Sequence, residues 1–300
     1  MTFDSFEKVD VGPAESSIRF VIGGRGPPLL LLHGFPQTHL MWRSVAPRLA
    51  ESFTVVCADL PGQGDSALAA ADEREPYSKR GMARKLVAAM TGCGYRRFGV
   101  AGHDRGGRVA YRMALDHSDA ITAIAVLDVI PMLDALELAD ERTLLSFWPW
   151  SLMAQPAPLP ERLVSRCPEA IIDDSTSQWG TPPDAFPPDV RQAYAAALSD
   201  PERVHAVCEE FRAAAQVDRK HDEWDRTAGK QISAPTLILW DRSGALSKWY
   251  QERGGPLAIW RRWAPHAVGE AVPGGHFFPE SEPDLVADRL LHFYSASLVQ

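Results

Sequence analysis

Short apolar runs recur along the chain, and each ends in a polar or glycine-containing segment. Two runs that alternate between apolar and polar residues predict a strand hairpin at residues 6–11 and 18–22. Continuous apolar runs predict strands buried on both faces, at residues 29–32, 53–58, 98–101, 121–127 and 236–240. Helical periodicity lies between them, for example at residues 82–90 and 108–115. This alternation predicts an α/β fold with a mostly parallel central sheet.

The pattern changes between about residues 131 and 230. Prolines cluster there, runs of the buried-strand type are missing, and large aromatic residues appear at Trp148, Trp150 and Trp179. A disordered linker would leave these side chains without an apolar surface to pack against. We therefore expect a helical cap at residues 131–230, inserted into a core formed by residues 1–130 and 231–300.

Composition narrows the class of protein. The chain has 300 residues, of which 45% are hydrophobic, and this is ample for one large core. Its net charge of -8 argues against a nucleic-acid partner, because nucleic-acid recognition needs a basic face. No apolar run is long enough to span a bilayer, so we expect a cytoplasmic protein with no membrane partner. The four cysteines are scattered and predict neither a disulfide framework nor a cysteine metal site.

The segment GHDRG at residues 102–106 carries the first candidate for chemistry. Its G-x-D-x-G spacing, between a predicted strand and a predicted helix, is typical of the nucleophile turn of the α/β-hydrolase fold. Glycines flank this turn because larger residues would collide with the neighbouring backbone. A serine usually occupies the central position, where this chain has Asp104. The segment therefore predicts that fold with Asp104 as the nucleophile.

Two other segments supply partners for a nucleophile. The motif HGFP follows an earlier strand and predicts the Phe35 backbone amide as an oxyanion-hole donor, together with the amide of Arg105. The motif GGHFFPE predicts His276 as the catalytic base. Asp128 ends one predicted strand and is the candidate acid that orients His276. Asp241 ends the next strand and could equally reach a histidine, so both aspartates stay open.

An aspartate at the nucleophile position changes the predicted reaction. Serine-esterase chemistry is excluded, because Asp104 has no hydroxyl group with which to attack. A carboxylate is already anionic at neutral pH and suits displacement at an sp³ carbon, which would produce an ester of the protein. His276 would then activate a water molecule that hydrolyses the ester. Two reactions fit this scheme, hydrolysis of a carbon–halogen bond and opening of an epoxide.

Arg105 and Arg108 lie in the first turn of the helix after Asp104. The helix dipole disfavours cations at this end, so their presence needs a reason. They could simply pair with surface acids. Placed three residues apart beside a nucleophile, they could instead face one way and bind a substrate carboxylate. An acidic protein needs such local cations to bind an anion.

Three segments resemble the haloacetate dehalogenases of the α/β-hydrolase superfamily, and fluoroacetate dehalogenases in particular; they read HGFPQTHLMWRSVAPRLAESFTVVCADLPGQGDS, AGHDRGGRVAYRMALDH and QPAPLPE. The resemblance covers nearly the whole chain and implies a hydrolase that cleaves the carbon–halogen bond of small 2-haloacids through an ester intermediate. It assigns Asp104 as nucleophile, His276 as base and Asp128 as its orienting acid. It also makes Arg105 and Arg108 the ligands of the substrate carboxylate. A homodimer without a metal or cofactor is the implied form.

The chain departs from this family at the halide pocket. The family holds the halide with a His-Trp pair and a Tyr, whereas here Pro149 stands at the His position and Trp150 keeps the Trp. Phe211 occupies the Tyr position. Trp148 or Trp179 could supply a replacement donor. With fewer donors, we expect a preference for chloride or bromide over fluoride as the leaving group.

Two alternatives to a dehalogenase follow from the same residues. An epoxide hydrolase would use the same Asp104, His276 and Asp128, but it usually needs a pair of cap tyrosines to protonate the opening oxygen. Tyr194 is the only tyrosine between residues 131 and 230. A catalytically silent ligand receptor is a second alternative, and the joint presence of the nucleophile, base and acid weighs against it.

Overall fold

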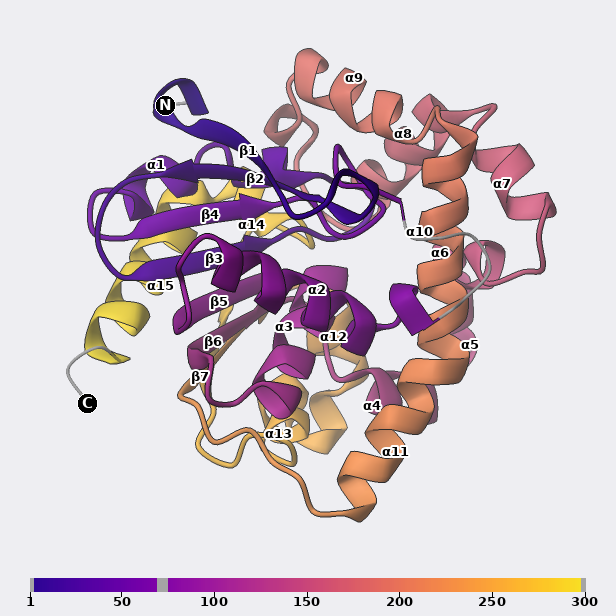
Figure 1. The fold of residues 1–300 in the computed structure, drawn as a ribbon. Helices are drawn as coiled ribbons and strands as arrows, with labels where there is room; N and C mark the ends of the chain where they lie inside the picture. Colours follow the sequence, from indigo (N-terminus) through magenta and orange to yellow (C-terminus); the bar gives the residue numbers. More distant parts are fainter. Residues whose placement is uncertain (1–2, 69–74, 298–300) are drawn as a thin grey trace.

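A computed structural model describes residues 3–68 and 75–297 and contains one eight-stranded sheet (Figure 1). The strand order is β1-β2-β4-β3-β5-β6-β7-β8. Strand β2 pairs antiparallel with β1 and β4, and every other pair is parallel. The predicted α/β fold with a mostly parallel sheet is confirmed. The strands are β1 (Glu7–Val11), β2 (Ile18–Gly23), β3 (Pro28–Leu32), β4 (Thr54–Ala58), β5 (Phe98–His103), β6 (Ile121–Leu127), β7 (Thr236–Asp241) and β8 (Val268–Val272).

The apolar runs mark the strands of the sheet to within a few residues. Strand β5 extends two residues beyond its predicted end, as far as His103, so that Asp104 follows the strand directly. Strand β8 lies at the edge and pairs with β7. Its residues alternate between exposed and partly buried positions, which is why its sequence lacks the continuous apolar run of the inner strands.

Helices cover both faces of the sheet, and the inner strands supply side chains to each face. Within β3, Leu30 and Leu32 belong to the core on one face, whereas Leu29 and Leu31 belong to the core on the other. Successive side chains of a strand point to opposite faces, so a strand between two helical layers is apolar at every position. The core helices are α1 (Ala46–Leu49), α2 (Lys79–Gly92), α3 (Arg105–Asp116), α12 (Ala245–Trp249), α13 (Gly255–Trp260), α14 (Phe278–Ser281) and α15 (Pro283–Ser297).

Between β6 and β7 the chain is helical, and its fully described residues 128–235 contain no strand. The helices are α4 (Met132–Glu137), α5 (Glu141–Ser146), α6 (Trp148–Met153), α7 (Leu159–Val164), α8 (Pro168–Gln178), α9 (Pro188–Ala197), α10 (Pro201–Ala213) and α11 (Arg219–Thr227). We call residues 131–235 the inserted segment. Its apolar cluster includes Phe35 and Phe277 from two loops of the sheet, so the segment packs over those loops.

The last part of the inserted segment also packs against the sheet layer. A five-residue π-helix, Ala214–Asp218, joins α10 to α11, and together they form the long helix along one side of Figure 1. Asp222 of α11 accepts a hydrogen bond from the Tyr111 hydroxyl at 2.7 Å and pairs with Arg112, both on α3. Asp225 pairs with the same arginine. The inserted segment is thus anchored to the core through buried ion pairs.

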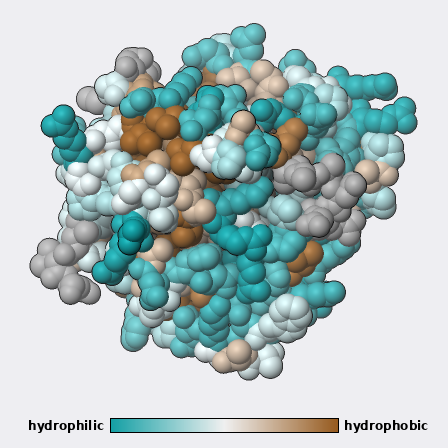
Figure 2. All heavy atoms as spheres, in the orientation of Figure 1, coloured by the Kyte–Doolittle hydropathy of each residue, from teal (hydrophilic) through white to brown (hydrophobic). Residues whose placement is uncertain are grey.

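The face of the molecule seen in Figure 2 is largely hydrophilic, and its apolar residues form scattered groups. Among the described helices, none combines the length and the apolar composition that a membrane-spanning helix requires.

Candidate active site

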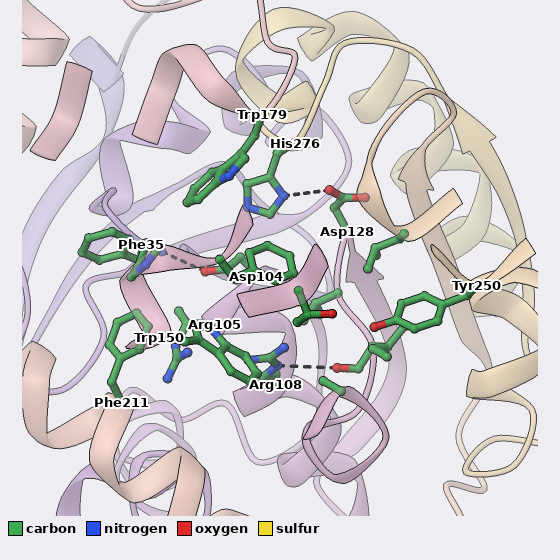
Figure 3. Close-up of a pocket in the computed structure, with 17 residues that line it drawn as sticks. Phe35, Asp104, Arg105, Arg108, Asp128, Trp150, Trp179, Phe211, Tyr250 and His276 are labelled. Atoms are coloured by element: carbon green, nitrogen blue, oxygen red, sulfur yellow. Dashed lines mark hydrogen bonds and ion pairs between the residues drawn. The ribbon is translucent and has the colours of Figure 1, made fainter. Parts of the chain in front are cut away.

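A cavity opens where parallel strands of the sheet end, beneath the inserted segment (Figure 3). Phe35 follows β3, Asp104 follows β5, Asp128 follows β6 and His276 follows β8. Because the carboxyl ends of parallel strands meet at one edge, residues that lie far apart in the sequence gather in one cavity. The other lining residues are Arg105, Arg108, Val129, Ile130, Ala135, Thr143, Phe147, Pro149, Trp150, Trp179, Phe211, Leu246 and Tyr250.

Asp104 occupies a sharp turn between β5 and α3. Its backbone has φ 46° and ψ -114°, a conformation that costs free energy in a residue other than glycine. The flanking glycines make the turn possible, because a Cβ atom on Gly102 would lie 2.3 Å from the Gly106 carbonyl oxygen. A Cβ atom on Gly106 would lie 2.4 Å from the His33 carbonyl oxygen. The glycine spacing in the sequence therefore reflects backbone contacts that leave no space for a side chain.

The Asp104 carboxylate is partly buried and ionised. Its Oδ1 accepts a hydrogen bond from the Phe35 backbone N–H at 3.0 Å, which leaves Oδ2 as the less constrained oxygen. Burial raises the pKa of Asp104, but the charges of His276, Arg105 and Arg108 outweigh burial and hold this pKa below its usual value of 3.8. Among the described residues, the Arg105 backbone amide makes no hydrogen bond to this carboxylate, so its role as an oxyanion donor stays a prediction.

Asp128 is the aspartate that contacts His276. The His276 Nδ1 lies 2.7 Å from Asp128 Oδ2, and Asp128 Oδ1 accepts a hydrogen bond from the Asp241 backbone N–H at 2.8 Å. The Asp241 side chain is used elsewhere, since its Oδ1 accepts a hydrogen bond from the Gly275 N–H at 3.3 Å. Of the two aspartates that the sequence left open, Asp128 therefore orients the ring, and Asp241 supports both Asp128 and the histidine loop.

The charges around His276 favour its protonated form. Burial lowers the pKa of His276, but the hydrogen bond to Asp128 and the charges of Asp128 and Asp104 raise it above the usual 6.5. The Asp104 charge contributes to this shift. Any reaction that neutralises Asp104 will therefore lower the pKa of His276 and favour the neutral imidazole.

His103, which precedes Asp104, is a buried neutral histidine. Burial and the charge of His276 lower the pKa of His103 to about 4. Its Nε2 lies 2.8 Å from the His276 carbonyl oxygen, and the two rings are 4.7 Å apart. The neutral ring donates its Nε2–H to that carbonyl and so links the Asp104 turn to the loop that carries His276. The sequence analysis assigns no specific role to this residue.

Arg105 is paired with a carboxylate of the inserted segment. Its Nε donates to Glu210 Oε1 at 2.9 Å, and its Nη2 lies 2.5 Å from Oε2. Burial raises the pKa of Glu210, but the charges of Arg105 and Lys79 outweigh burial and hold this pKa below its usual value. The carboxylate therefore stays ionised. Lys79 contacts the same carboxylate and lies 3.4 Å from Asp218. Of the Arg105 side-chain nitrogens, only Nη1 lacks a hydrogen-bond partner among the described residues.

Arg108 has no such carboxylate. Its side chain is 4% exposed, its Nε makes a long hydrogen bond of 3.5 Å to the Ile130 carbonyl oxygen, and its guanidinium lies 4.6 Å from the centre of the Trp150 ring. Within residues 3–68 and 75–297, Nη1 has no hydrogen-bond partner and no acid lies within ion-pair distance. Burial and the charge of Arg105 lower the pKa of Arg108. A buried guanidinium without a counter-charge is costly, which indicates that an anionic ligand completes the site.

The four residues predicted for the halide pocket line the cavity, and they are mainly apolar. Phe211 lies against Arg105, with its ring centre 3.9 Å from the guanidinium carbon. Pro149 has no side-chain donor. The Trp179 ring packs 5.2 Å from His276, but its Nε1 donates to the Ser146 carbonyl oxygen at 3.2 Å. Trp150 remains as the indole donor, because Trp179 is already hydrogen-bonded and Trp148 does not line the cavity.

Two residues of the site escaped the sequence analysis. Glu210, the partner of Arg105, lies in α10 and carried no recognisable motif. Tyr250 follows α12 and lines the cavity with 3% of its surface exposed. The available signal was its place after β7, since loops at this end of a parallel sheet collect around one site.

A larger groove adjoins the cavity and offers a route to it. Five residues line both spaces, and these are Asp128, Phe147, Trp179, Leu246 and His276. The groove also contains the exposed cations Arg242 and Lys248. Among the described residues, no group of three or more His, Cys, Asp or Glu side chains is arranged to hold a metal ion.

The cavity thus combines an ionised carboxylate beside an amide donor, a histidine held by a second carboxylate, and two arginines with unpaired N–H groups. The carboxylate can act as a nucleophile, and the histidine can activate water. The free guanidinium donors can bind an anion, and a carboxylate matches their planar geometry.

Comparisons with known proteins agree with this arrangement. Residues 27–283 match the family model described as the alpha/beta hydrolase fold. The chain is 38% identical to a fluoroacetate dehalogenase from Burkholderia sp. over 98% of its length and 95% of that protein. It is 30% identical to a soluble epoxide hydrolase from Corynebacterium sp. strain C12, over 93% of each chain.

Two solved structures superpose closely on this one. A protein from Nostoc sp. PCC 7120, described as an alpha/beta hydrolase, gives a TM-score of 0.92 at 41% identity, over 97% of this chain and 99% of that one. A variant of a Pseudomonas aeruginosa protein, described as an epoxide hydrolase and solved with bound MFA, gives a TM-score of 0.92 at 39% identity. That match covers 99% of this chain and 98% of the other.

Proposed function

The chain belongs to the fluoroacetate dehalogenase family of the α/β-hydrolase superfamily, and we propose that it hydrolyses the carbon–halogen bond of small 2-haloacids. The observation that carries this proposal is Arg108, a buried guanidinium without a carboxylate partner in the described structure, beside the ionised Asp104. A haloacid offers both things that the cavity lacks, an anionic group for the arginines and an sp³ carbon for the carboxylate.

The first step is displacement of the halide by Asp104. Oδ1 is held by the Phe35 amide, so Oδ2 attacks the carbon that bears the halogen. The halide leaves with the electron pair of the carbon–halogen bond, and the substrate becomes an ester of Asp104. Arg105 and Arg108 hold the substrate carboxylate, which orients the carbon toward the nucleophile.

The second step is hydrolysis of this ester. Esterification removes the negative charge of Asp104, so the pKa of His276 falls and the neutral imidazole becomes available as a base. Its Nδ1 is occupied by Asp128, so Nε2 takes a proton from water. The water oxygen attacks the ester carbonyl carbon, and the Phe35 N–H stabilises the charge that develops on Oδ1. Collapse of this intermediate releases the 2-hydroxyacid and restores the Asp104 carboxylate.

The leaving-group side of the cavity favours chloride and bromide over fluoride. Fluoride is strongly hydrated and needs several donors when it leaves in a dry cavity, each worth about 2.7 to 4 kcal/mol by analogy with an oxyanion-hole donor. Phe211 and Pro149 offer no donor, and Trp179 has already given its N–H to Ser146. Heavier halides carry more diffuse charge and need less of this stabilisation.

Epoxide hydrolysis is the second candidate, because relatives described as epoxide hydrolases match most of the chain. An opening epoxide needs a donor to its oxygen, and Tyr250 lines the cavity. Tyr194, the tyrosine of the inserted segment, donates instead to Glu280 at 3.1 Å. An epoxide is neutral and leaves the Arg108 charge without a partner, so the haloacid fits better.

Halide release distinguishes these reactions. Purified protein is incubated with fluoroacetate, chloroacetate, bromoacetate and a simple terminal epoxide, and the released halide, glycolate and diol are measured. We expect glycolate from chloroacetate and bromoacetate at rates above that for fluoroacetate. An Asp104→Asn variant serves as the control and releases no halide. Diol formation without halide release would replace this proposal by the epoxide reaction.

A further inference from the structure

Tyr250 is a buried tyrosine whose hydroxyl faces the cavity without a partner. It follows α12, is 3% exposed, and packs with Ile130, Ala135, Leu246 and Ile259 in a small apolar cluster. Within the described residues, its hydroxyl makes no hydrogen bond, and its ring packs in this cluster. Burial raises the pKa of Tyr250 to about 12, so the group is a neutral donor at ordinary pH.

The position of Tyr250 separates it from Phe211 (Figure 3). In Figure 3, Phe211 and Tyr250 lie on opposite sides of the cavity, with Arg108 between them and the Tyr250 hydroxyl directed inward. The charge of Arg108 acts to lower the pKa of Tyr250, against the larger effect of burial. The hydroxyl is therefore placed on the Arg108 side and opposite Phe211 (Figure 3), while Trp150 packs against the cluster that contains Tyr250.

The donors on this side are unequally available. Arg105 spends two of its nitrogens on Glu210 and keeps Nη1 free, whereas Arg108 Nη1 is buried without a partner in the described structure. The two oxygens of a carboxylate can together accept about four hydrogen bonds. Both arginines approach the anion from α3, so a donor from another element can reach a lone pair that they leave open, and Tyr250 is the neutral donor on the side of Arg108.

We propose that the Tyr250 hydroxyl donates to the substrate carboxylate together with Arg105 and Arg108, and so acts as a specificity residue for 2-haloacids. This inference rests on the proposed function, since it takes the bound anion to be the carboxylate of the substrate. The three donors converge from α3 and from the end of α12, which are joined in the sequence by neither a motif nor a regular spacing.

The test removes the hydroxyl and keeps the ring. A Tyr250→Phe variant and a matched Tyr95→Phe control, whose tyrosine does not line the cavity, are compared with the unmodified protein. Acetate is the probe, because it presents the carboxylate and has no leaving group. Its dissociation constant is measured by calorimetry and as a competitive inhibition constant against chloroacetate. Thermal unfolding checks that both variants are folded.

We expect Tyr250→Phe to weaken acetate binding by about 10- to 100-fold, as a hydrogen bond to a charged group does. The KM for chloroacetate rises with it, while kcat changes less, and Tyr95→Phe changes neither. Unchanged acetate binding in Tyr250→Phe, or equal losses in the two variants, would overturn the role of Tyr250. If the unmodified protein bound no acetate and released no halide, the proposed function would fail with it. Halide release with normal acetate binding in Tyr250→Phe would reject this inference alone.

Discussion

The carboxyl edge of the sheet and the inserted segment form opposite walls of one cavity, and they contribute different things to it. The sheet edge supplies polar groups at backbone-determined positions, since Asp104 and Asp128 both have positive φ angles and both are hydrogen-bonded to backbone N–H groups. The inserted segment supplies mainly rings, such as Phe211 and Trp150, and one ion-paired carboxylate, Glu210.

This difference separates the reaction from the choice of substrate. Chemistry needs reacting groups held within hydrogen-bonding distance, and strand ends hold them rigidly. Selection of a leaving group depends on the side chains that the inserted segment contributes to its wall of the cavity, which we call the helical wall. These side chains can change without disturbing the sheet. Variants on the sheet edge should therefore alter turnover, and variants on the helical wall should alter substrate preference.

The largest effect is expected at the sheet edge, from His276→Ala. Displacement of the halide needs only Asp104, whereas ester hydrolysis needs the base, so turnover should fall by about 10⁴-fold. The ester should accumulate on the protein. Intact-protein mass spectrometry after addition of chloroacetate should show the added carboxymethyl group, located by digestion on the peptide that contains Asp104. Rapid turnover without an adduct would contradict the two-step scheme.

Substitutions of the two arginines should have different effects, because only Arg105 has a carboxylate partner in the inserted segment. Arg108→Met removes a buried charge that has no acid partner in the described structure, so the use of chloroacetate should fall by about 10²- to 10³-fold while stability is kept or increased. Arg105→Met leaves Glu210 buried with Lys79 as its remaining cation, and should lower the free energy of unfolding by about 3 kcal/mol.

Denaturant unfolding and kinetics with chloroacetate and its neutral amide measure both effects. The amide should lose far less than the acid in Arg108→Met. Equal losses on acid and amide would show that Arg108 is structural.

On the helical wall, the double variant Pro149→His with Phe211→Tyr should improve fluoride release relative to chloride. Each substitution adds a donor on the leaving-group side, and we expect the fluoride-to-chloride ratio of kcat/KM to rise by about 10- to 100-fold. Halide release from fluoroacetate and chloroacetate gives this ratio. Release of fluoride as fast as chloride by the unmodified protein would contradict the leaving-group preference that we attribute to the helical wall.

The smallest effect is a pH dependence that differs between the two steps. Only the neutral His276 ring is a base, so ester hydrolysis should slow about tenfold per pH unit below the pKa that His276 has in the ester, which lies below its pKa in the free protein because the Asp104 charge is gone. The pKa of Asp104 is lowered from 3.8, so the carboxylate remains ionised and ester formation should stay constant over the same range. Rapid-quench mass spectrometry from pH 5 to 9 measures the two rates separately. If both rates depended on pH in the same way, His276 would not act as a base in the second step only.

Local patterns in the sequence predicted most of the fold and several of the polar residues that gather in the cavity. Strand β3 could be read from four consecutive leucines, because a strand between two helical layers is apolar at each position. Asp104 could be read from its flanking glycines, because the turn excludes any Cβ atom at Gly102 and Gly106. Both patterns reflect a requirement at the position itself, an apolar side chain or the lack of one. This requirement can be read without knowing which distant segment supplies the neighbouring atoms.

The partners of the charged groups depended on the tertiary structure. Sequence order left Asp128 and Asp241 equivalent, and the resemblance favoured Asp128. The packing of β6, β7 and β8 places the Asp128 carboxylate against His276 and that of Asp241 against the loop that carries the histidine. The two arginines also looked alike, three residues apart on one helix. Glu210, more than a hundred residues away, pairs with Arg105 and leaves Arg108 free for a ligand. Periodicity reports whether a position is buried, but the sign and distance of the charge that meets it are set by which elements fold together.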